Sequence, residues 1–181
     1  YDDVHGYELW KSDGTNNGTT IVKEINPGVY GAAVTNISYL KNNITLFEAN
    51  DGKTGFELWK TDGTSAGTML VKNINQSTTA SSDPYSLTPG PGNKSLTFIA
   101  YDPQYGHELR ITDGSESGTG VIKDIYKGSF DSWPYSPATV KNTTYFFATI
   151  DDPAPHYSDD VFLVARLWNT DGTDKGTSMI P

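Results

Sequence analysis

Short runs of alternating apolar and polar residues, separated by turn residues, extend along the whole chain. In GFELWKT (55–61), Phe56 and Leu58 fall on one face while Glu57 and Trp59 fall on the other, because successive side chains of a strand point to opposite faces. The Asp-Gly pair that follows suits a tight connection, since Asp can hydrogen-bond the backbone two residues on and Gly adopts positive φ. The pattern predicts a β-hairpin with a structured connection of about six residues.

This hairpin pattern occurs four times. The copies are ELWKSDGTNNGT (8–19), ELWKTDGTSAGT (57–68), ELRITDGSESGT (108–119) and RLWNTDGTDKGT (166–177). The first three copies are followed by an apolar strand that contains a lysine (TIVKEI, MLVKNI and GVIKDI), a polar loop, and a β-rich run (ITLFEA, SLTFIA and TYFFAT). A further short strand is predicted near ISYL (37–40), YSL (85–87) and ATV (138–140).

The period of about 50 residues predicts an all-β fold of tandem antiparallel repeats, arranged as β-propeller-like blades with little or no helix. The blades are either a partial ring or part of a larger array. We divide the chain into units at 1–43, 44–93, 94–142 and 143–181, the last with an insertion at 151–163. One unit cannot bury a face alone, so it must stack on its neighbours. The sequence starts and ends within a unit, and we therefore expect open β edges that pair with copies of this chain.

The string ELWxxDGTxxGT, preceded by DGxxG and followed by LVKxI, resembles a tandem repeat of large secreted and surface-anchored proteins, chiefly bacterial. The resemblance covers essentially the full chain, and the copy at 57–68 matches best. It implies β-propeller-like repeats, a cell-surface location and no settled catalytic activity. Two copies depart from the repeat. Arg110 stands where Trp is found, and Arg166 stands where Glu is found, in a copy that lacks the upstream Gly.

Composition excludes several classes of function. The 181 residues carry a formal charge of −9 and no run of Lys or Arg, which argues against nucleic-acid binding and against docking on anionic membranes. No segment approaches the roughly 20 apolar residues that cross a bilayer, so membrane insertion is not expected. The chain has no cysteine, which excludes disulfides, thiolate metal sites and Cys nucleophiles.

The sequence contains six sequons for N-glycosylation, and three of them fall in the turn before the β-rich run of successive units. Glycosylation of an extracellular protein at exposed turns explains them, and so does the preference of Asn for turns followed by a strand-forming Thr. The candidate residues are Asn17, Asn36, Asn43, Asn75, Asn93 and Asn142.

Aromatic residues offer candidate contact sites. Trp10, Trp59 and Trp168 occupy one position of the repeat, and we expect them to fill the space between stacked sheets. Trp133 and Tyr135 lie outside that position in a Pro-rich loop, so we assign them to contact with a carbohydrate or another partner.

The repeated Asp-Gly turns could ligate Ca²⁺, but carboxylates are denser in the acidic insertion DDPAPHYSDD. Its carboxylates could bind Ca²⁺, although acidic loops of this kind are commonly only solvated. No other cofactor is expected. The candidate ligands are Asp151, Asp152, Asp159 and Asp160.

No catalytic constellation is present in the sequence, which lacks the GxSxG, HExxH, GxGxxG and Walker patterns. We therefore expect a protein that is not an enzyme: an extracellular, cell-surface structural or adhesive glycoprotein that self-assembles, for example into filaments, or attaches at a surface. The alternative is a carbohydrate-binding propeller, and a propeller hydrolase ranks below both.

Overall fold

The computed structural model describes residues 1–77, 79–151 and 163–181, and they form four antiparallel sheets. The first sheet has two strands, β1 (Leu9–Lys11) and β2 (Thr20–Lys23). Each of the others has four, in the following order: β3 (Thr35–Lys41), β4 (Ile44–Asn50), β5 (Phe56–Thr61) and β6 (Met69–Lys72); β7 (Tyr85–Pro89), β8 (Leu96–Asp102), β9 (Gly106–Thr112) and β10 (Gly120–Val121); β11 (Tyr135–Val140), β12 (Thr143–Asp151), β13 (Leu163–Thr170) and β14 (Ser178–Met179). One 3₁₀ turn, η1 (Pro91–Asn93), joins β7 to β8.

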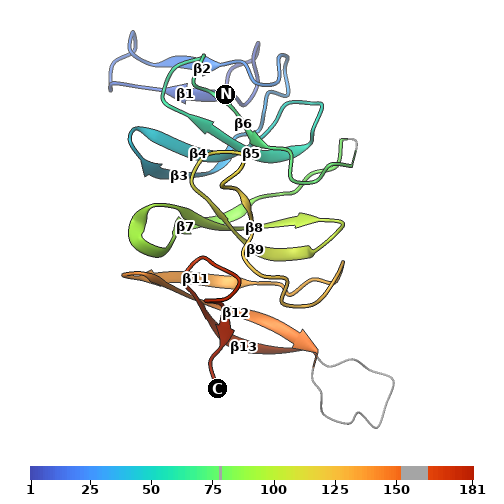
Figure 1. Ribbon diagram of the computed structural model, residues 1–181. Helices are drawn as coiled ribbons and strands as arrows, with labels where there is room; N and C mark the ends of the chain where they lie inside the picture. The colour runs from blue at the N-terminus through green and yellow to red at the C-terminus, as the bar shows by residue number, and fades with distance from the viewer. Residues whose placement is uncertain (78, 152–162) are drawn as a thin grey trace.

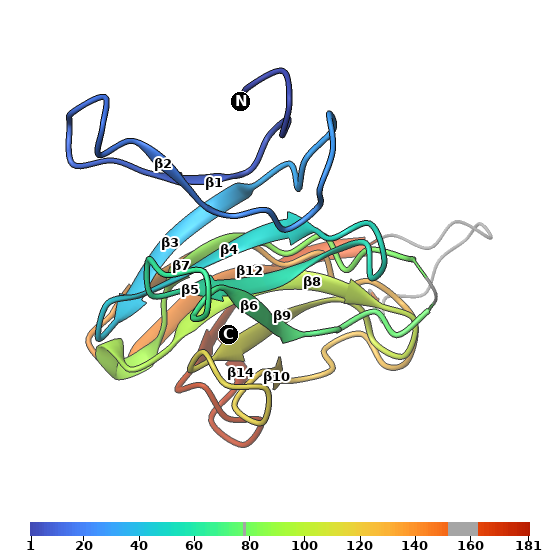
Figure 2. The same cartoon turned by 90° about the horizontal axis from the view of Figure 1, so that it is seen from above.

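The all-β prediction is confirmed, and so are the extra short strands, which are β3, β7 and β11. The sheets lie one upon another in a stack, with the two termini at opposite ends (Figure 1). Seen along the stack, the middle strands of the three larger sheets overlie one another (Figure 2). The described residues form no closed barrel or ring of blades, so the structure shows stacked sheets and not a complete propeller.

The sheets are out of phase with the units predicted from sequence. A unit such as 44–93 spans β4 to β7, whereas the sheet consists of β3 to β6. The physical reason lies in the connections. Residues 42–43 and 141–142 form tight turns between β3 and β4 and between β11 and β12, and residues 90–95 with η1 join β7 to β8. The strands on both sides of each predicted boundary therefore pair with each other.

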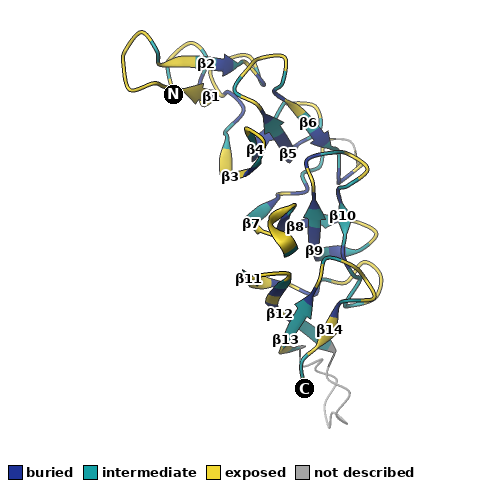
Figure 3. Ribbon diagram, turned by 60° about the vertical axis from the view of Figure 1, so that its left-hand side comes forward, coloured by how far each residue is buried: buried dark blue, intermediate teal, exposed yellow. Residues whose placement is uncertain are grey.

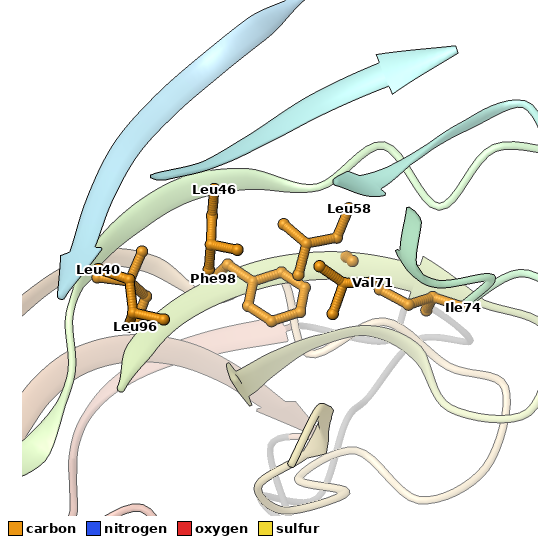
Figure 4. Packing of buried hydrophobic residues seen from close by; sticks show 8 residues of the cluster. Leu40, Leu46, Leu58, Val71, Ile74, Leu96 and Phe98 are labelled. Carbon is orange, nitrogen blue, oxygen red and sulfur yellow. The ribbon is translucent and has the colours of Figure 1, made fainter. Parts of the chain in front are cut away.

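Three apolar layers hold the stack together, one between each pair of neighbouring sheets. Adjacent residues of a strand serve different layers, as expected from the pleat. Leu46 and Leu58 pack toward the third sheet, whereas Phe47 and Trp59 pack toward the first. In the layer between the second and third sheets, Phe98 lies against Leu46 and Leu58 (Figure 4).

The buried surface therefore lies between the sheets, while the hairpin connections are mostly exposed (Figure 3). Phe47, Phe98 and Phe146 hold the same position of the three larger sheets, and each is almost completely buried. Burying a Phe side chain contributes about 1.5–3 kcal/mol. The stack is held together by this repeated aromatic position and its aliphatic neighbours.

Candidate functional site

The twelve-residue motif forms the same hydrogen-bonded connection in all four copies. In the second copy, Asp62 Oδ1 accepts hydrogen bonds from the Thr64 backbone N (2.9 Å) and from Thr64 Oγ1 (2.7 Å). Thr64 Oγ1 accepts a hydrogen bond from the Gly67 N at 3.0 Å, and Thr68 Oγ1 donates to the Thr64 carbonyl at 2.7 Å. The side-chain and backbone donors of Thr64 lower the pKa of Asp62. The carboxylate of the repeated Asp is therefore already hydrogen-bonded within its own turn.

The second glycine of the motif is required by packing. A Cβ on Gly67 would lie 2.1 Å from Asp62 Oδ1, and the equivalent glycines of the other copies are equally close to their own aspartates. The first glycine, Gly63, has a φ of 85°, a left-handed conformation that glycine adopts without strain. Both glycines are explained by the connection itself, with no bound group.

A buried glutamate at the start of the hairpin binds the loop that leads to the next sheet. Glu57 accepts hydrogen bonds from the backbone N of Ile74 (2.9 Å) and Asn75 (3.1 Å), and from Ser82 Oγ (2.7 Å). Glu108 makes the equivalent contacts in the third sheet. Burial raises the pKa of Glu57 to about 7 and that of Glu108 to about 8, and the hydrogen bonds oppose this rise. This role was not predicted from the sequence, although the Glu that opens the motif in three copies was its signal.

Lysines link each sheet to the hairpin connection of the next. Lys11 Nζ donates to the Gly63 carbonyl at 3.0 Å, and Lys60 Nζ donates to the Gly114 carbonyl at 2.8 Å. A second pair comes from the strand after the motif, where Lys23 and Lys72 donate to the carbonyls of Thr68 and Thr119, each at 2.7 Å. The sequence shows a lysine in the strand that follows each of the first three motif copies, but only the stacking of the sheets shows which carbonyl groups the lysines bind.

The sequons differ in accessibility. Asn17, Asn36, Asn43, Asn93 and Asn142 are exposed, and the last three lie at or beside the turns that follow β3, β7 and β11. Asn75 is 3% exposed, and its Nδ2 donates to the Ser81 carbonyl at 2.9 Å. A glycosyltransferase could not reach the Asn75 amide in this conformation.

The two loop aromatics belong to different pairs. Trp133 is 47% exposed and stacks on His107 of the third sheet, with ring centroids 4.3 Å apart and planes at 17°. Tyr135 is 45% exposed and stacks on Phe147 of its own sheet at 5.2 Å. The His107 ring in turn lies 2.8 Å from Asp131 Oδ1. The structure therefore separates the two residues that the sequence placed together.

Trp133 also has an unusual backbone conformation. Its φ is 43°, and Ala33 and Asp83, at the same position of the preceding repeats, have φ of 49° and 45°. The repeat imposes this left-handed conformation, which is unfavourable for a bulky side chain. The backbone conformation at this position is therefore less favourable for Trp133 than for Ala33 or Asp83 in the preceding repeats.

The candidate metal ligands fall almost entirely outside the described residues. Asp152, Asp159 and Asp160 lie outside the described residues, and Asp151 ends β12 without a described side chain. The parts of the chain that are described contain no group of three or more His, Asp or Glu side chains arranged to hold a metal ion.

Among the described residues, no further sheet covers the outer face of the first sheet or of the fourth. In the third sheet, Ile99 pairs with Leu109 and is completely buried beneath the fourth sheet. At the same position of the fourth sheet, Phe147 pairs with Leu167 and is 38% exposed. Tyr145, also 38% exposed, corresponds to the buried Leu46 of the second sheet. The last sheet thus exposes aromatic side chains at positions that are buried in the inner sheets.

The first sheet is open in two ways. Trp10, equivalent to the buried Trp59, is 36% exposed. Strand β1 pairs only with β2, whereas the corresponding strand β5 pairs with both β4 and β6. Within the ranges given above, both ends of the stack therefore expose surface or backbone that is covered inside it.

Neither the fold nor the comparisons identify a relative. No helix among the described residues is long and apolar enough to cross a membrane. No family model matches the chain, and no similar protein was found among curated proteins or solved structures.

Proposed function

We propose that this protein is an extracellular structural or adhesive scaffold whose copies stack end to end, the last sheet of one copy against the first sheet of another. The observation that carries the proposal is the exposed aromatic face of the fourth sheet, formed by Tyr135, Tyr145 and Phe147. Inner sheets bury the same face beneath the next sheet. Exposed apolar patches of this kind commonly mark interaction surfaces.

The internal interfaces support a second copy as the occupant of this face. Each of them packs one sheet against the buried Phe of the next sheet, and Trp59 and Trp168 contribute to two of the three interfaces. Trp10 is the exposed equivalent in the first sheet. Because the two end faces differ, their contact is heterologous. Such a contact produces a closed ring if the rotation between copies closes, and an open filament if it does not. The exposed sequons support an extracellular location, where glycans on the turns would leave the end faces free.

The test measures the self-association of the purified chain. We expect concentration-dependent assembly in sedimentation velocity between about 1 and 100 µM, the range in which a moderate interface is half occupied. Extended particles should be visible by electron microscopy. Phe147→Asp should weaken association at least tenfold, because it places a charge in the interface. A chain that stays monomeric over the whole range would overturn the proposal, and so would unchanged association of Phe147→Asp.

Carbohydrate binding is a second candidate function, favoured by Trp133. One face of its indole is stacked on His107, and nearly half of its surface is exposed. Aromatic side chains held in this way can stack on a sugar ring. We expect Trp133→Asp, which restores the residue type of Asp83, to remove glycan binding while leaving the melting temperature unchanged or higher.

That prediction is checked with a glycan array and thermal unfolding of the two proteins side by side. A wild-type chain without any array signal would count against carbohydrate binding at this residue, as would a variant that keeps the full signal.

A further inference from the structure

A pocket of about 370 Å³ opens between the second and third sheets, beside the residue that most clearly breaks the repeat. Arg110 lines it and is 4% exposed. Trp59 and Trp168 occupy the same position of the neighbouring sheets and pack into their apolar layers. Places where a chain departs from its own local rule without a gain in packing are candidates for function. The pocket is within the range of small-ligand sites, at its lower end.

The guanidinium of Arg110 is only partly used by the fold. Its Nε donates to the Ala100 carbonyl at 3.2 Å, and its Nη2 donates a hydrogen bond to Asp102 Oδ2. Asp102 is already a turn residue, since its Oδ1 accepts from the backbone N of Gln104 (2.8 Å) and Tyr105 (3.0 Å). No residue that the structure describes accepts a hydrogen bond from Nη1. An Arg carries five N–H donors, so this side chain has donors left for a ligand.

The lining of the pocket favours a small anion that also carries hydroxyl groups. Lys72 and Arg110 are cationic, and Asp102 is the single acidic lining residue, whereas the whole chain carries −9. Lys72 Nζ donates one hydrogen bond, to the Thr119 carbonyl, and keeps two further donors. Gln76, Gln104 and Tyr105 add neutral hydrogen-bonding groups to the lining.

We propose that this pocket binds a sugar acid of monosaccharide size, with its carboxylate on Arg110 and its hydroxyls on the neutral side chains. Arg is suited to carboxylates because its planar N–H groups match the two oxygens. The proposal is independent of stacking between copies, because the pocket lies inside the stack and away from both end faces.

The alternative role for Arg110 is a purely structural ion pair with Asp102. A buried ion pair commonly adds little net stability over well-packed apolar residues of similar volume. Arg110→Trp restores the residue of the neighbouring sheets and fills space at the pocket. We expect this variant to fold with at least the wild-type melting temperature and to lose the ligand.

The experiment titrates the isotope-labelled chain with glucuronate and, separately, with glucose, and follows amide resonances of residues 102–106 and 120–121 by NMR. We expect saturable shifts with glucuronate and at least tenfold weaker binding of glucose. Oligogalacturonate in a parallel titration distinguishes a residue within a polysaccharide from a free sugar acid. Arg110→Trp and Arg110→Met should each abolish the glucuronate shifts, so that the test survives if one of them fails to fold. Arg166→Met removes the exposed arginine of β13, which does not line the pocket; it is the matched control and should bind glucuronate as wild type does.

Three results would overturn the inference. One is the absence of shifts at about 10 mM glucuronate, above the millimolar affinity expected of a weak single-carboxylate site. Another is an affinity that is unchanged in both Arg110 variants. The third is binding of glucose as tight as that of glucuronate, which would exclude a carboxylate-selective site.

Discussion

The free energy of unfolding should fall as the pH rises from 5 to 9, by on the order of 3 kcal/mol for each of two buried glutamates. Glu57 and Glu108 are both fully buried between strand and loop. Desolvation raises their pKa values to about 7 and about 8 from an ordinary value near 4.5. Such shifts are differences in proton affinity between the folded and unfolded chain, and they therefore make stability depend on pH.

The direction follows from which state holds the protons. Below pH 4.5 both carboxyls are protonated in the folded and the unfolded chain, and their contribution to stability is fully present. Between pH 4.5 and about 7 to 8 the unfolded chain has lost these protons while the folded chain still holds them, so stability declines with pH. Above that window both states are ionised, and the loss is complete.

Hydrogen bonds limit the loss without reversing it. Ser82 and two backbone amides donate to Glu57, and Arg110 also favours its charged form. Glu108 has the equivalent donors, but the nearby Asp124 raises its pKa further. We accordingly expect Glu108 to titrate at the higher pH and to contribute the larger share.

Thermal and urea unfolding at pH 5, 7 and 9 checks this prediction. The double variant Glu57→Gln and Glu108→Gln should be less stable at pH 5 but should lose most of the pH dependence in this window. Glu116→Gln, at an exposed position of a hairpin connection, is the matched control and should retain the wild-type slope. A double variant with the full wild-type slope would show that other groups are responsible.

Phe146→Ala should reduce the free energy of unfolding by about 3–5 kcal/mol, whereas Phe147→Ala should cost about 1 kcal/mol or less. The two residues are neighbours in β12, and their side chains point to opposite faces of the sheet. Phe146 is 1% exposed and packs with Ile99 and Leu109 of the third sheet. Its removal leaves a cavity between two sheets, while Phe147 loses only a half-exposed contact.

Urea unfolding at low protein concentration measures both variants without a contribution from self-association. Equal losses in the two variants would mean that the outer face of the fourth sheet is covered even in the monomer. The pair thus reports on the end face independently of the association experiment.

The repeated motif determined the hairpins, their connections and the number of repeats. Asp62 with Thr64, and Gly67 against Asp62, are contacts within a few residues, and such local chemistry can be read directly from sequence. The apolar alternation likewise indicated that Leu58 and Trp59 face opposite layers. The all-β class followed from these local rules alone.

The strands of one sheet are those that pair across the connections between β3 and β4, β7 and β8, and β11 and β12. The unit boundaries predicted from the sequence cut through these connections. Trp133 and Tyr135 are two residues apart, yet Trp133 stacks on His107 of the third sheet and Tyr135 on Phe147 of the fourth. Asn75 has a sequon like the other five asparagines, and only its hydrogen bond within the loop shows that it is enclosed.

Chemistry within one hairpin specifies the all-β repeats, the Asp-Gly turns and the departure from the repeat at Arg110, and these features can be read from the sequence. Which faces of the sheets are covered depends on contacts between residues about 50 positions apart, so only the arrangement of the sheets shows it. Those contacts join Lys60 to Gly114, place Phe98 beneath Leu46, and leave the pocket beside Arg110 open to solvent.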